Sequence, residues 1–324
     1  MRDSLITVFG GTGFLGRHTV RALARAGYRV RVAVRYPNQG FFLPPMGNVG
    51  QIGLVKCNVR EPEQVAAAVK GADAVVNLTG ILYQRGEQSF EAVHIEAAEA
   101  IAKAAHAAGA SSLVHVSAIG ADKDGESSYA ASKGEGELRV RDAYPAAAIL
   151  RPSLVFGPED DFFNRFAALA RVLPFLPLIG GGTTKFQPVF VGDLADAIVR
   201  CVSDAGTRGK TYELGGPTVY TFKELMQIVL RETCRTRFLV PLPFVLATIQ
   251  AMFLQFMPKP LLTTDQVTLL KSDNVVTGAD TLLSLGIRPT SVEAEVPAYL
   301  WRFRPKGQYD ELVREKIIEA PAPQ

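Results

Sequence analysis

The fold of this chain is decided by one stretch near its start, Ile6-Thr7-Val8-Phe9-Gly10-Gly11-Thr12-Gly13-Phe14-Leu15-Gly16-Arg17. An apolar, β-prone run leads directly into a glycine turn, and a helical pattern follows at once. Gly10 lets the chain turn sharply, Gly13 lets a pyrophosphate approach backbone N–H groups, and Gly16 lets the helix pack close to the sheet. The exposed N–H groups and the helix dipole favour an anion. We therefore predict a nucleotide site that includes Gly10, Thr12, Gly13, Phe14, Leu15 and Gly16.

The glycine spacing is G-x-x-G-x-x-G, whereas the standard dinucleotide fingerprint is G-x-G-x-x-G. The bare pattern is weak, and the alternative is a glycine-rich turn that binds nothing. Between a strand and a helix at the start of a βα unit, the same pattern is strong. The next βα unit fits as well, so we favour a dinucleotide-binding fold.

Composition excludes several classes of protein. The chain has 324 residues, 48% of them hydrophobic and 21% charged, which suggests one large domain or two interleaved soluble ones. A net charge of +3 and no basic, aromatic-rich patch argue against nucleic acid as a partner. Cys57, Cys201 and Cys234 lie far apart with no histidine at metal-ligand spacing, so we expect reduced thiols and no metal site. No signal peptide precedes the first strand, so we expect a bacterial or already processed chain.

The second strand predicts the type of nucleotide. It covers residues 28–35 and ends at Arg35, where NAD-selective folds place an acidic residue that binds the ribose 2′-hydroxyl. Arg17, just past the glycine turn, lies where it can reach the same place. Two guanidinium groups suit a 2′-phosphate, which a carboxylate would repel. We predict NADPH as the cofactor; the alternative is two solvated arginines.

Further strands at 52–57, 73–80 and 112–117 alternate with helices at 61–70 and 90–109. This alternation predicts an α/β fold with a Rossmann-type doubly wound parallel sheet, covered on both faces. Asn58 and Val59 follow one strand, where Asn58 either binds the adenine amine or forms a simple turn. Leu78, Thr79 and Gly80 end another strand, and we expect them beneath the pyrophosphate and ribose.

Motifs along the chain resemble the short-chain dehydrogenase/reductase family in its extended and atypical branches. The resemblance covers roughly residues 4–235 and rests on the glycine turn and on Asp73, Asn77-Leu78-Thr79-Gly80, Ser117, Tyr129-Ala130-Ala131-Ser132-Lys133, Leu150-Arg151-Pro152, Val189-Phe190-Val191-Gly192-Asp193 and Tyr212-Glu213-Leu214-Gly215-Gly216-Pro217. It implies that Ser117, Tyr129, Lys133 and Pro152 bind the cofactor.

In this family Tyr129 and Lys133 form the proton-transfer pair, since four residues of helix put both side chains on one face. A lysine ammonium favours the phenolate of the tyrosine, which exchanges a proton with the substrate while hydride moves. The alternative is that the pair only holds the cofactor ribose. Extended members carry another hydroxyl just after Ser117, and here Ala118 and Ile119 follow. One lost donor to an oxyanion lowers the rate by about 10²–10³.

The second half of the chain contains long apolar segments in place of the strand–helix alternation. Residues 173–182 are predicted to form a stiff apolar loop that roofs a pocket. Residues 238–257 include a helix after Pro243 with almost no polar face, and it is too short to span a bilayer, which needs roughly twenty residues. The protein's own core, a partner or a membrane surface must cover it. Its basic flanks suit anionic headgroups; they are Arg231, Arg235, Arg237 and Lys259.

We expect a cofactor-binding core over 1–160 with a strand and helix returning at about 186–216, a smaller interleaved C-terminal lobe over 161–300, and an extended tail over 301–324.

One atypical branch of the family is especially similar: the NADPH-binding accessory subunits of respiratory complex I, in their bacterial form. The similarity includes Arg17, Arg35, the Ser117 region, residues 157–166, Lys185-Phe186-Gln187-Pro188-Val189 and the apolar segment after Arg235. It implies a permanently held nucleotide, other complex I subunits as partners, and docking at the junction of the peripheral and membrane arms near the quinone site.

It also implies peripheral contact with the membrane, on the cytoplasmic side of a bacterial inner membrane or the matrix side in mitochondria. The alternatives are a free NADPH-dependent reductase or epimerase that acts on a hydrophobic carbonyl, and a nucleotide-sensing regulator.

Overall fold

The computed structural model describes residues 4–257 and 260–307. Within these residues the chain divides into two units. The first contains residues 4–153, 191–215 and 276–288, and the second contains 154–190, 216–275 and 289–307. The chain thus leaves the first unit and returns to it twice.

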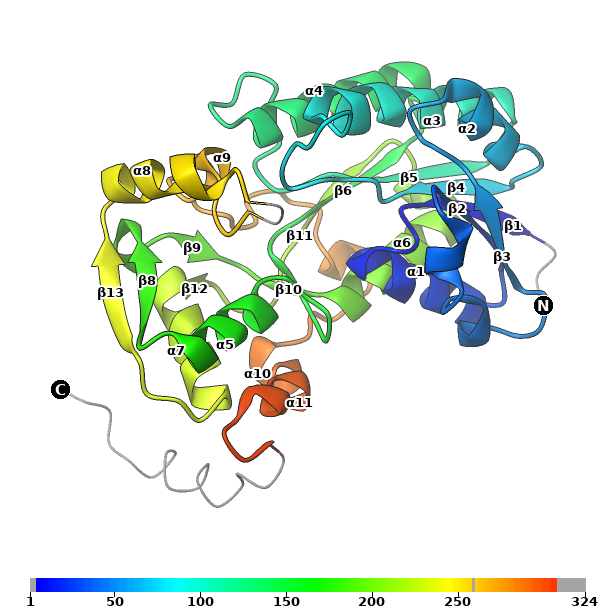
Figure 1. The fold of residues 1–324 in the computed structure, drawn as a ribbon. Coiled ribbons are helices and arrows are strands. Elements are labelled where there is room, and N and C mark those ends of the chain that lie inside the picture. Colours follow the sequence, from blue (N-terminus) through cyan, green and yellow to red (C-terminus); the bar gives the residue numbers. More distant parts are fainter. Residues whose placement is uncertain (1–3, 258–259, 308–324) are drawn as a thin grey trace. The chain divides into compact units, whose positions relative to one another are not determined.

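In the described part of the first unit, seven parallel strands form one sheet (Figure 1). Their order is β11-β6-β5-β4-β1-β2-β3. The strands are β1 (Leu5–Phe9), β2 (Arg29–Val34), β3 (Ile52–Lys56), β4 (Ala74–Asn77), β5 (Ser112–Val116), β6 (Ala148–Pro152) and β11 (Thr211–Leu214). Every residue of β4 and β5 is buried, as expected for strands covered on both faces.

Helices cover both faces of this sheet. They are α1 (Phe14–Arg25), α2 (Pro62–Val69), α3 (Ala97–Ala107), α4 (Ser128–Ala143) and α6 (Val191–Ser203). The helices α2, α3 and α4 lie on one face, and α1 packs beside α6 on the other (Figure 1). A core that includes Phe9, Val69, Ile101, Leu113 and Val140 fills the space beneath α2–α4. The doubly wound fold is therefore confirmed.

Shorter helical turns complete the first unit. The 3-10 turns are η1 (Pro37–Gly40), η2 (Pro44–Met46), η5 (Ala205–Thr207) and η6 (Leu283–Leu285). The long α-helix predicted for residues 90–109 is wrong in its first part, because Glu91–Glu96 form a π-helical turn, η3, ahead of α3. Here α4 approaches so closely that a Cβ on Gly136 would lie 2.1 Å from the His94 carbonyl oxygen.

The second unit is built from short elements around an aromatic core. Three two-stranded sheets join β7 to β10, β9 to β12 and β8 to β13. The elements are β7 (Val155–Phe156), α5 (Phe163–Val172), β8 (Phe175–Ile179), η4 (Gly180–Gly182), β9 (Lys185–Phe186), β10 (Val189–Phe190), β12 (Tyr220–Thr221), α7 (Phe222–Glu232), β13 (Phe238–Leu242), α8 (Phe244–Leu254), α9 (Thr264–Leu269), α10 (Val292–Glu295), α11 (Pro297–Leu300) and η7 (Trp301–Phe303). Phe156, Phe163, Phe222, Leu176 and Met226 pack in its core.

Two predictions for this unit need correction. Residues 175–179 are not part of a loop, because β8 pairs in parallel with β13, from Phe175 opposite Phe238 to Ile179 opposite Leu242. The prolines of both strands are compatible with a two-stranded sheet, in which each strand has a free edge. The predicted tail begins later than residue 301: Trp301–Phe303 form a turn, and the following Arg304 is buried and donates to the Glu232 carbonyl oxygen. Residues 308–324 lie outside the described residues.

The predicted apolar helix is α8, and the described residues leave most of it uncovered. Ala247 and Ala251 are buried against Ile179 and Val267. Its large side chains are exposed, by 71% at Val245 and 76% at Phe253. Among the described residues, no helix combines the length and hydropathy that crossing a bilayer requires.

Candidate dinucleotide-binding edge

The predicted site residues gather at one edge of the first unit's sheet. Most of them follow or end one of the parallel strands, so the carboxyl ends of these strands bring them to the same edge. In strand order they are Gly10 after β1, Arg35 after β2, Asn58 and Val59 after β3, Leu78, Thr79 and Gly80 after β4, Ser117 after β5 and Pro152 at the end of β6. The chain passes from β3 across β1 to β4, and ligands of open α/β sheets bind where the strand order reverses in this way.

The glycine turn is held by backbone contacts that exclude side chains. Gly10 has φ +77°, and a Cβ there would lie 2.9 Å from the Leu78 carbonyl. A Cβ on Gly16 would lie 2.2 Å from the Gly10 carbonyl oxygen. Gly11, to which the sequence pattern assigns no purpose, would place a Cβ 2.4 Å from a methyl of Val32 on β2. These three glycines therefore permit close packing between the strands, the turn and α1.

Gly13 is the exposed glycine of this turn, and it caps the amino end of α1. A Cβ there would meet only the Gly10 carbonyl oxygen, at 3.3 Å, so the glycine leaves the backbone open toward solvent. Thr12, Phe14 and Leu15 beside it are partly exposed. The first turn of α1 contains no acidic side chain, which leaves the positive end of the helix dipole available to an anion.

The two arginines predicted to select the nucleotide have different surroundings. The guanidinium of Arg17 lies over the ring of Phe42, 4.9 Å from its centre. Phe42 belongs to the loop between β2 and β3, which is anchored by fully buried Leu43 and by Gly40 packed near Thr12. Arg35 is exposed. The loop thus holds one cation against an aromatic ring while the other faces solvent.

Asn58 forms a turn that starts α2. Its side-chain oxygen accepts from the Arg60 N–H at 3.3 Å, and its carbonyl accepts from the Glu61 N–H at 3.0 Å. Its own N–H donates to Gln64 at 2.9 Å. This geometry supports the simpler of the two roles given to Asn58, and an adenine contact stays a prediction.

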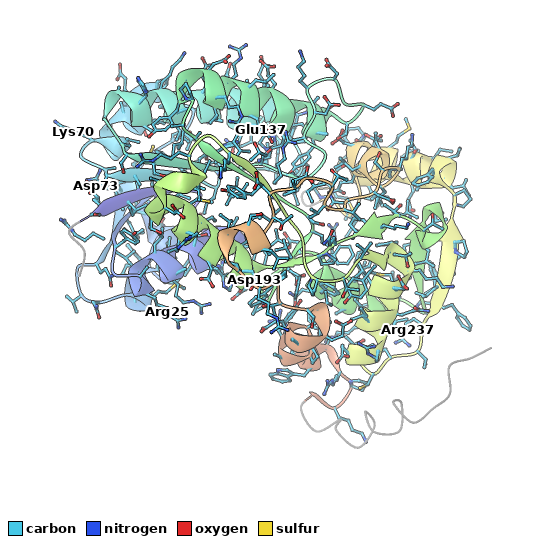
Figure 2. The ribbon with its side chains drawn as sticks, turned by 180° about the vertical axis from the view of Figure 1, so that it is seen from behind. Arg25, Lys70, Asp73, Glu137, Asp193 and Arg237 are labelled. Atoms are coloured by element: carbon cyan, nitrogen blue, oxygen red, sulfur yellow. The ribbon has the colours of Figure 1, made fainter. Side chains whose placement is uncertain are left out.

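Asp73, which the family resemblance includes, lies at the opposite edge of the sheet. Its carboxylate accepts from the Leu5 N–H at 2.6 Å, where β1 begins (Figure 2). Asp73 therefore fixes the start of two strands and lies away from the candidate site.

Lys133 is a buried cation at the candidate site. Its Nζ donates to the Val116 carbonyl at 3.3 Å, and a Cβ on Gly80 would lie 3.4 Å from it. Burial lowers the pKa of Lys133 to about 8, and the nearby Glu137 carboxylate acts in the opposite direction. Glu137, on the same helix (Figure 2), receives two hydrogen bonds from Arg151, at 2.9 and 2.6 Å. The helix α4 thus brings Lys133 to the ends of β4 and β5.

Two buried polar atoms nearby have no hydrogen-bond partner among the described residues: Ser117 Oγ and His115 Nε2. Ser117 is 4% exposed and lies at the strand end where Lys133 Nζ meets Val116. A buried hydroxyl without a partner is costly, and a ribose hydroxyl offers both a donor and an acceptor. Ser117 Oγ and Lys133 Nζ beside Gly80 therefore fit the ribose and nicotinamide end of a dinucleotide.

The family motif includes Asn77, but no sequence pattern predicted the polar network that Asn77 forms with His115 beneath these residues. Asn77 Oδ1 accepts from the Thr79 N–H at 3.0 Å and from its hydroxyl at 2.6 Å, while Asn77 Nδ2 donates to His115 Nδ1 at 3.1 Å. Burial, followed by the charge of Lys133, lowers the pKa of His115 to about 3, so His115 is neutral. A histidine and an asparagine inside apolar strands were the signal that could have indicated this network.

The positions after Ser117 supply no second hydroxyl. Ala118 and Ile119 occupy them, and the Ile119 N–H donates to the Pro152 carbonyl at 3.0 Å. Among residues 4–257 and 260–307, no three His, Cys, Asp or Glu side chains come together as metal ligands.

Comparisons with known proteins agree with this geometry. The sequence model of the NAD dependent epimerase/dehydratase family matches residues 6–215. The mitochondrial NADH dehydrogenase (ubiquinone) 1 alpha subcomplex subunit 9 of Arabidopsis thaliana is 37% identical over 96% of this chain and 81% of its own length. A ceramide reductase of Caulobacter vibrioides is 36% identical over 60% of each chain.

Among solved structures, an NADPH-dependent quinone oxidoreductase of Escherichia coli, complexed with NADPH, superposes with a TM-score of 0.71. It is 20% identical and covers 91% of this chain and 99% of its own. At this identity the likeness concerns the fold.

Proposed function

This chain belongs to the NAD dependent epimerase/dehydratase family, and from this premise we propose that it is an accessory subunit of respiratory complex I that holds NADPH as a structural cofactor. The relative's name supports the assembly, because it designates a subunit of NADH dehydrogenase (ubiquinone). The partners of this chain are then other subunits of complex I.

The observation that carries this proposal is the uncovered apolar surface of α8. Val245, Leu246, Ile249, Met252 and Phe253 are each about half exposed or more. Clustered large apolar side chains on a protein surface mark an interaction site. We expect complex I subunits to cover most of α8 in the assembled state.

We place this surface next to the membrane. No acidic residue occurs from 233 to 264, and the segment contains Arg235, Arg237 and Lys259. A helix of 11 residues that is apolar on its exposed side and flanked by positive charge suits an interface with anionic headgroups. The expected location is the arm junction near the quinone site, on the cytoplasmic side of a bacterial inner membrane or the matrix side of a mitochondrial one.

Selection of NADPH over NADH rests on Arg17 and Arg35. Neither position nor its neighbours offers the acid that binds a free ribose 2′-hydroxyl, and two guanidinium groups suit a 2′-phosphate. Gly10–Gly16 and the amino end of α1 would hold the pyrophosphate, and Ser117 and Lys133 would hold the nicotinamide ribose.

Bound NADPH supplies a hydride donor, yet the surroundings favour retention over turnover. Lys133 offers an ammonium to a ribose hydroxyl and favours the anionic form of a phenol nearby. Ala118 and Ile119 provide no donor for a substrate oxyanion. The chain's own residues therefore bind and orient the nucleotide better than they would stabilise a reacting carbonyl.

The experiment that tests the cofactor is acid or heat denaturation of the natively purified protein, followed by identification of the released nucleotide. We expect close to one NADPH or NADP⁺ for each chain after gel filtration, because a structural cofactor exchanges slowly. A preparation that releases no nucleotide, or only NAD(H), would contradict the proposal.

A second function, reduction or epimerisation of a hydrophobic carbonyl substrate, is favoured by one observation. Tyr129 and Lys133 lie on one helix at the required spacing, and the pKa of Lys133 is lowered to about 8 by burial. The ceramide reductase relative also carries a name that designates a reductase of a lipid. Substrate-dependent NADPH oxidation that disappears in Tyr129→Phe would support this function, and no oxidation over a panel of lipid ketones would exclude it.

A further inference from the structure

His94 joins three segments around the candidate site. It lies in the π-helical turn Glu91–Glu96, and its imidazole is 2% exposed. Nε2 accepts the Ile81 N–H at 3.0 Å, and Nδ1 lies 2.8 Å from Ser132 Oγ on α4. Ile81 directly follows the Leu78–Gly80 segment at the end of β4. One side chain therefore connects the nucleotide-facing segment with the helix that carries Tyr129 and Lys133.

The hydrogen bonds determine which nitrogen of His94 carries the proton. The backbone N–H of Ile81 can only donate, so Nε2 is unprotonated and Nδ1–H donates to Ser132 Oγ. The Ser132 hydroxyl in turn donates to the Tyr129 carbonyl at 2.8 Å. Three hydrogen bonds thus run in one direction, from the segment after β4 to the backbone of Tyr129.

His94 is held neutral in this position. Burial is the largest cause, followed by the positive charge of Lys133 and by His115, and together they lower the pKa of His94 to about 2. A neutral imidazole keeps one donor and one acceptor, which both of its hydrogen bonds require.

Ring packing and backbone contact restrict His94 further. Its ring lies edge-on to Tyr129, with 5.4 Å between centres at 88°, and stacks on Phe90 at 5.2 Å and 17°. A Cβ on Gly80 would lie 3.8 Å from His94 Nε2 and 3.4 Å from Lys133 Nζ. The imidazole and the lysine therefore both lie next to Gly80.

We propose that His94 is a positioning residue: it sets the separation between the Leu78–Ile81 segment and α4, and thereby how closely Gly80 approaches Lys133 on that helix. This inference rests on the proposed function, which puts the ribose and nicotinamide of NADPH there. An apolar residue would fill a similar volume but would leave the partly buried Ile81 N–H without its acceptor. π-Helical turns occur frequently at functional sites, which agrees with this role.

Two substitutions separate the two hydrogen bonds of His94, the one with Ile81 and the one with Ser132. In His94→Gln the side-chain oxygen takes the place of Nε2 and still accepts from Ile81. In His94→Asn the amide nitrogen takes the place of Nδ1 and still donates to Ser132, while the Ile81 N–H loses its acceptor. His94→Leu removes both hydrogen bonds. Since Asn and Gln are both polar amides, they are matched controls for each other.

The test measures how fast NADPH dissociates from the full-length protein. Excess NADP⁺ displaces the bound NADPH, and the change in NADPH fluorescence reports its release. Loss of the Nε2 acceptor leaves the partly buried Ile81 N–H unpaired and loosens its segment. We therefore expect His94→Asn and His94→Leu to release NADPH roughly tenfold faster, and His94→Gln to stay within about threefold of wild type. Melting temperatures of the nucleotide-free proteins report the purely structural effect. If His94→Leu fails to fold, the comparison of Gln with Asn decides.

Equal NADPH dissociation rates in wild type, His94→Gln and His94→Asn would overturn the inference, whatever happens to the melting temperatures. Nitrogen-15 NMR of the imidazole gives a second readout: a protonated Nδ1 and an unprotonated Nε2 agree with the inference, and the opposite tautomer contradicts it. A wild-type protein that binds no NADPH overturns the proposed function and this inference together. A wild type that holds NADPH, with variants that hold it equally well, overturns only the inference.

Discussion

At the scale of single residues, charge determines which nucleotide the candidate site prefers and how the stability of the fold depends on pH. Arg35 is exposed after β2, and Arg17 is held against the Phe42 ring. Lys133 is buried beside two neutral histidines. In the proposed function the first two positive charges bind the 2′-phosphate. The third makes the nucleotide-free fold dependent on pH.

Arg35→Asp should weaken NADPH binding far more than NADH binding, because a carboxylate repels the 2′-phosphate that the guanidinium attracts. Loss of a charged hydrogen bond corresponds to roughly 10–100-fold in affinity for NADPH. The measurement is fluorescence titration of both nucleotides. Arg25→Asp, the same change at the far end of α1 (Figure 2), is the control and should leave both affinities unchanged. Equal losses for NADPH and NADH would show that Arg35 does not contact the 2′-phosphate.

Lys133→Met should stabilise the nucleotide-free protein at neutral pH. Burial lowers the pKa of the folded-state lysine from 10.5 to about 8, so between these values the unfolded chain binds more protons and wild-type stability rises with pH. The advantage of the variant should therefore shrink from about pH 8 to about pH 10, as measured by urea unfolding. A difference that stays constant over this range would contradict a buried, charged lysine.

At the scale of elements, close backbone packing of α4 on the π-helical turn organises the site. A Cβ on Gly136 would lie 2.1 Å from the His94 carbonyl oxygen, and one on Gly134 would lie 2.3 Å from the Lys123 nitrogen. Glycine ordinarily weakens a helix interior by about 1 kcal/mol relative to alanine. Two glycines in the middle of α4 are therefore explained by the contact they permit.

Gly136→Ala should destabilise the protein by about 1–3 kcal/mol, although helix propensity alone predicts stabilisation. Chemical denaturation measures this change. Gly53→Ala is the control, because a Cβ at Gly53 on β3 would meet nothing within 4 Å. A Gly136→Ala protein as stable as wild type would mean that α4 and the turn are packed less closely.

Sequence patterns predicted the elements that depend on local signals. The parallel sheet follows from buried runs such as Ala74–Asn77, and the turn after Phe9 follows from its glycines. The strand β8 was missed because its partner β13 lies about sixty residues away, and no local pattern records that pairing. Leu173–Gly182 with its prolines therefore resembled a loop. The π-helical turn was missed because no local pattern records its close contact with Gly136 on another helix.

The residues of the candidate site also differ in whether local sequence patterns indicate them. Arg17, Arg35 and the glycines could be named as candidates because they stand at fixed offsets from a strand end, and their contact with a nucleotide stays a prediction. His94 and His115 were not found, since their hydrogen bonds to Ile81 and Asn77 depend on tertiary packing.

At the scale of the whole molecule, the chain combines a first unit that carries the candidate nucleotide site with a second unit that carries the uncovered apolar helix α8. Phe253→Glu should leave the melting temperature nearly unchanged, because its side chain is 76% exposed, and should abolish association with complex I. Val172→Glu, at an 82% exposed position of α5, is the matched control in the same unit and should associate normally. Blue-native electrophoresis of membranes that contain each variant measures the association.

The most direct test is native purification of this chain from its own cells under mild detergent, with mass spectrometry of the proteins and nucleotides that elute with it. The account predicts stoichiometric complex I subunits together with about one NADPH or NADP⁺ for each chain. A nucleotide-free protein that elutes alone would contradict it.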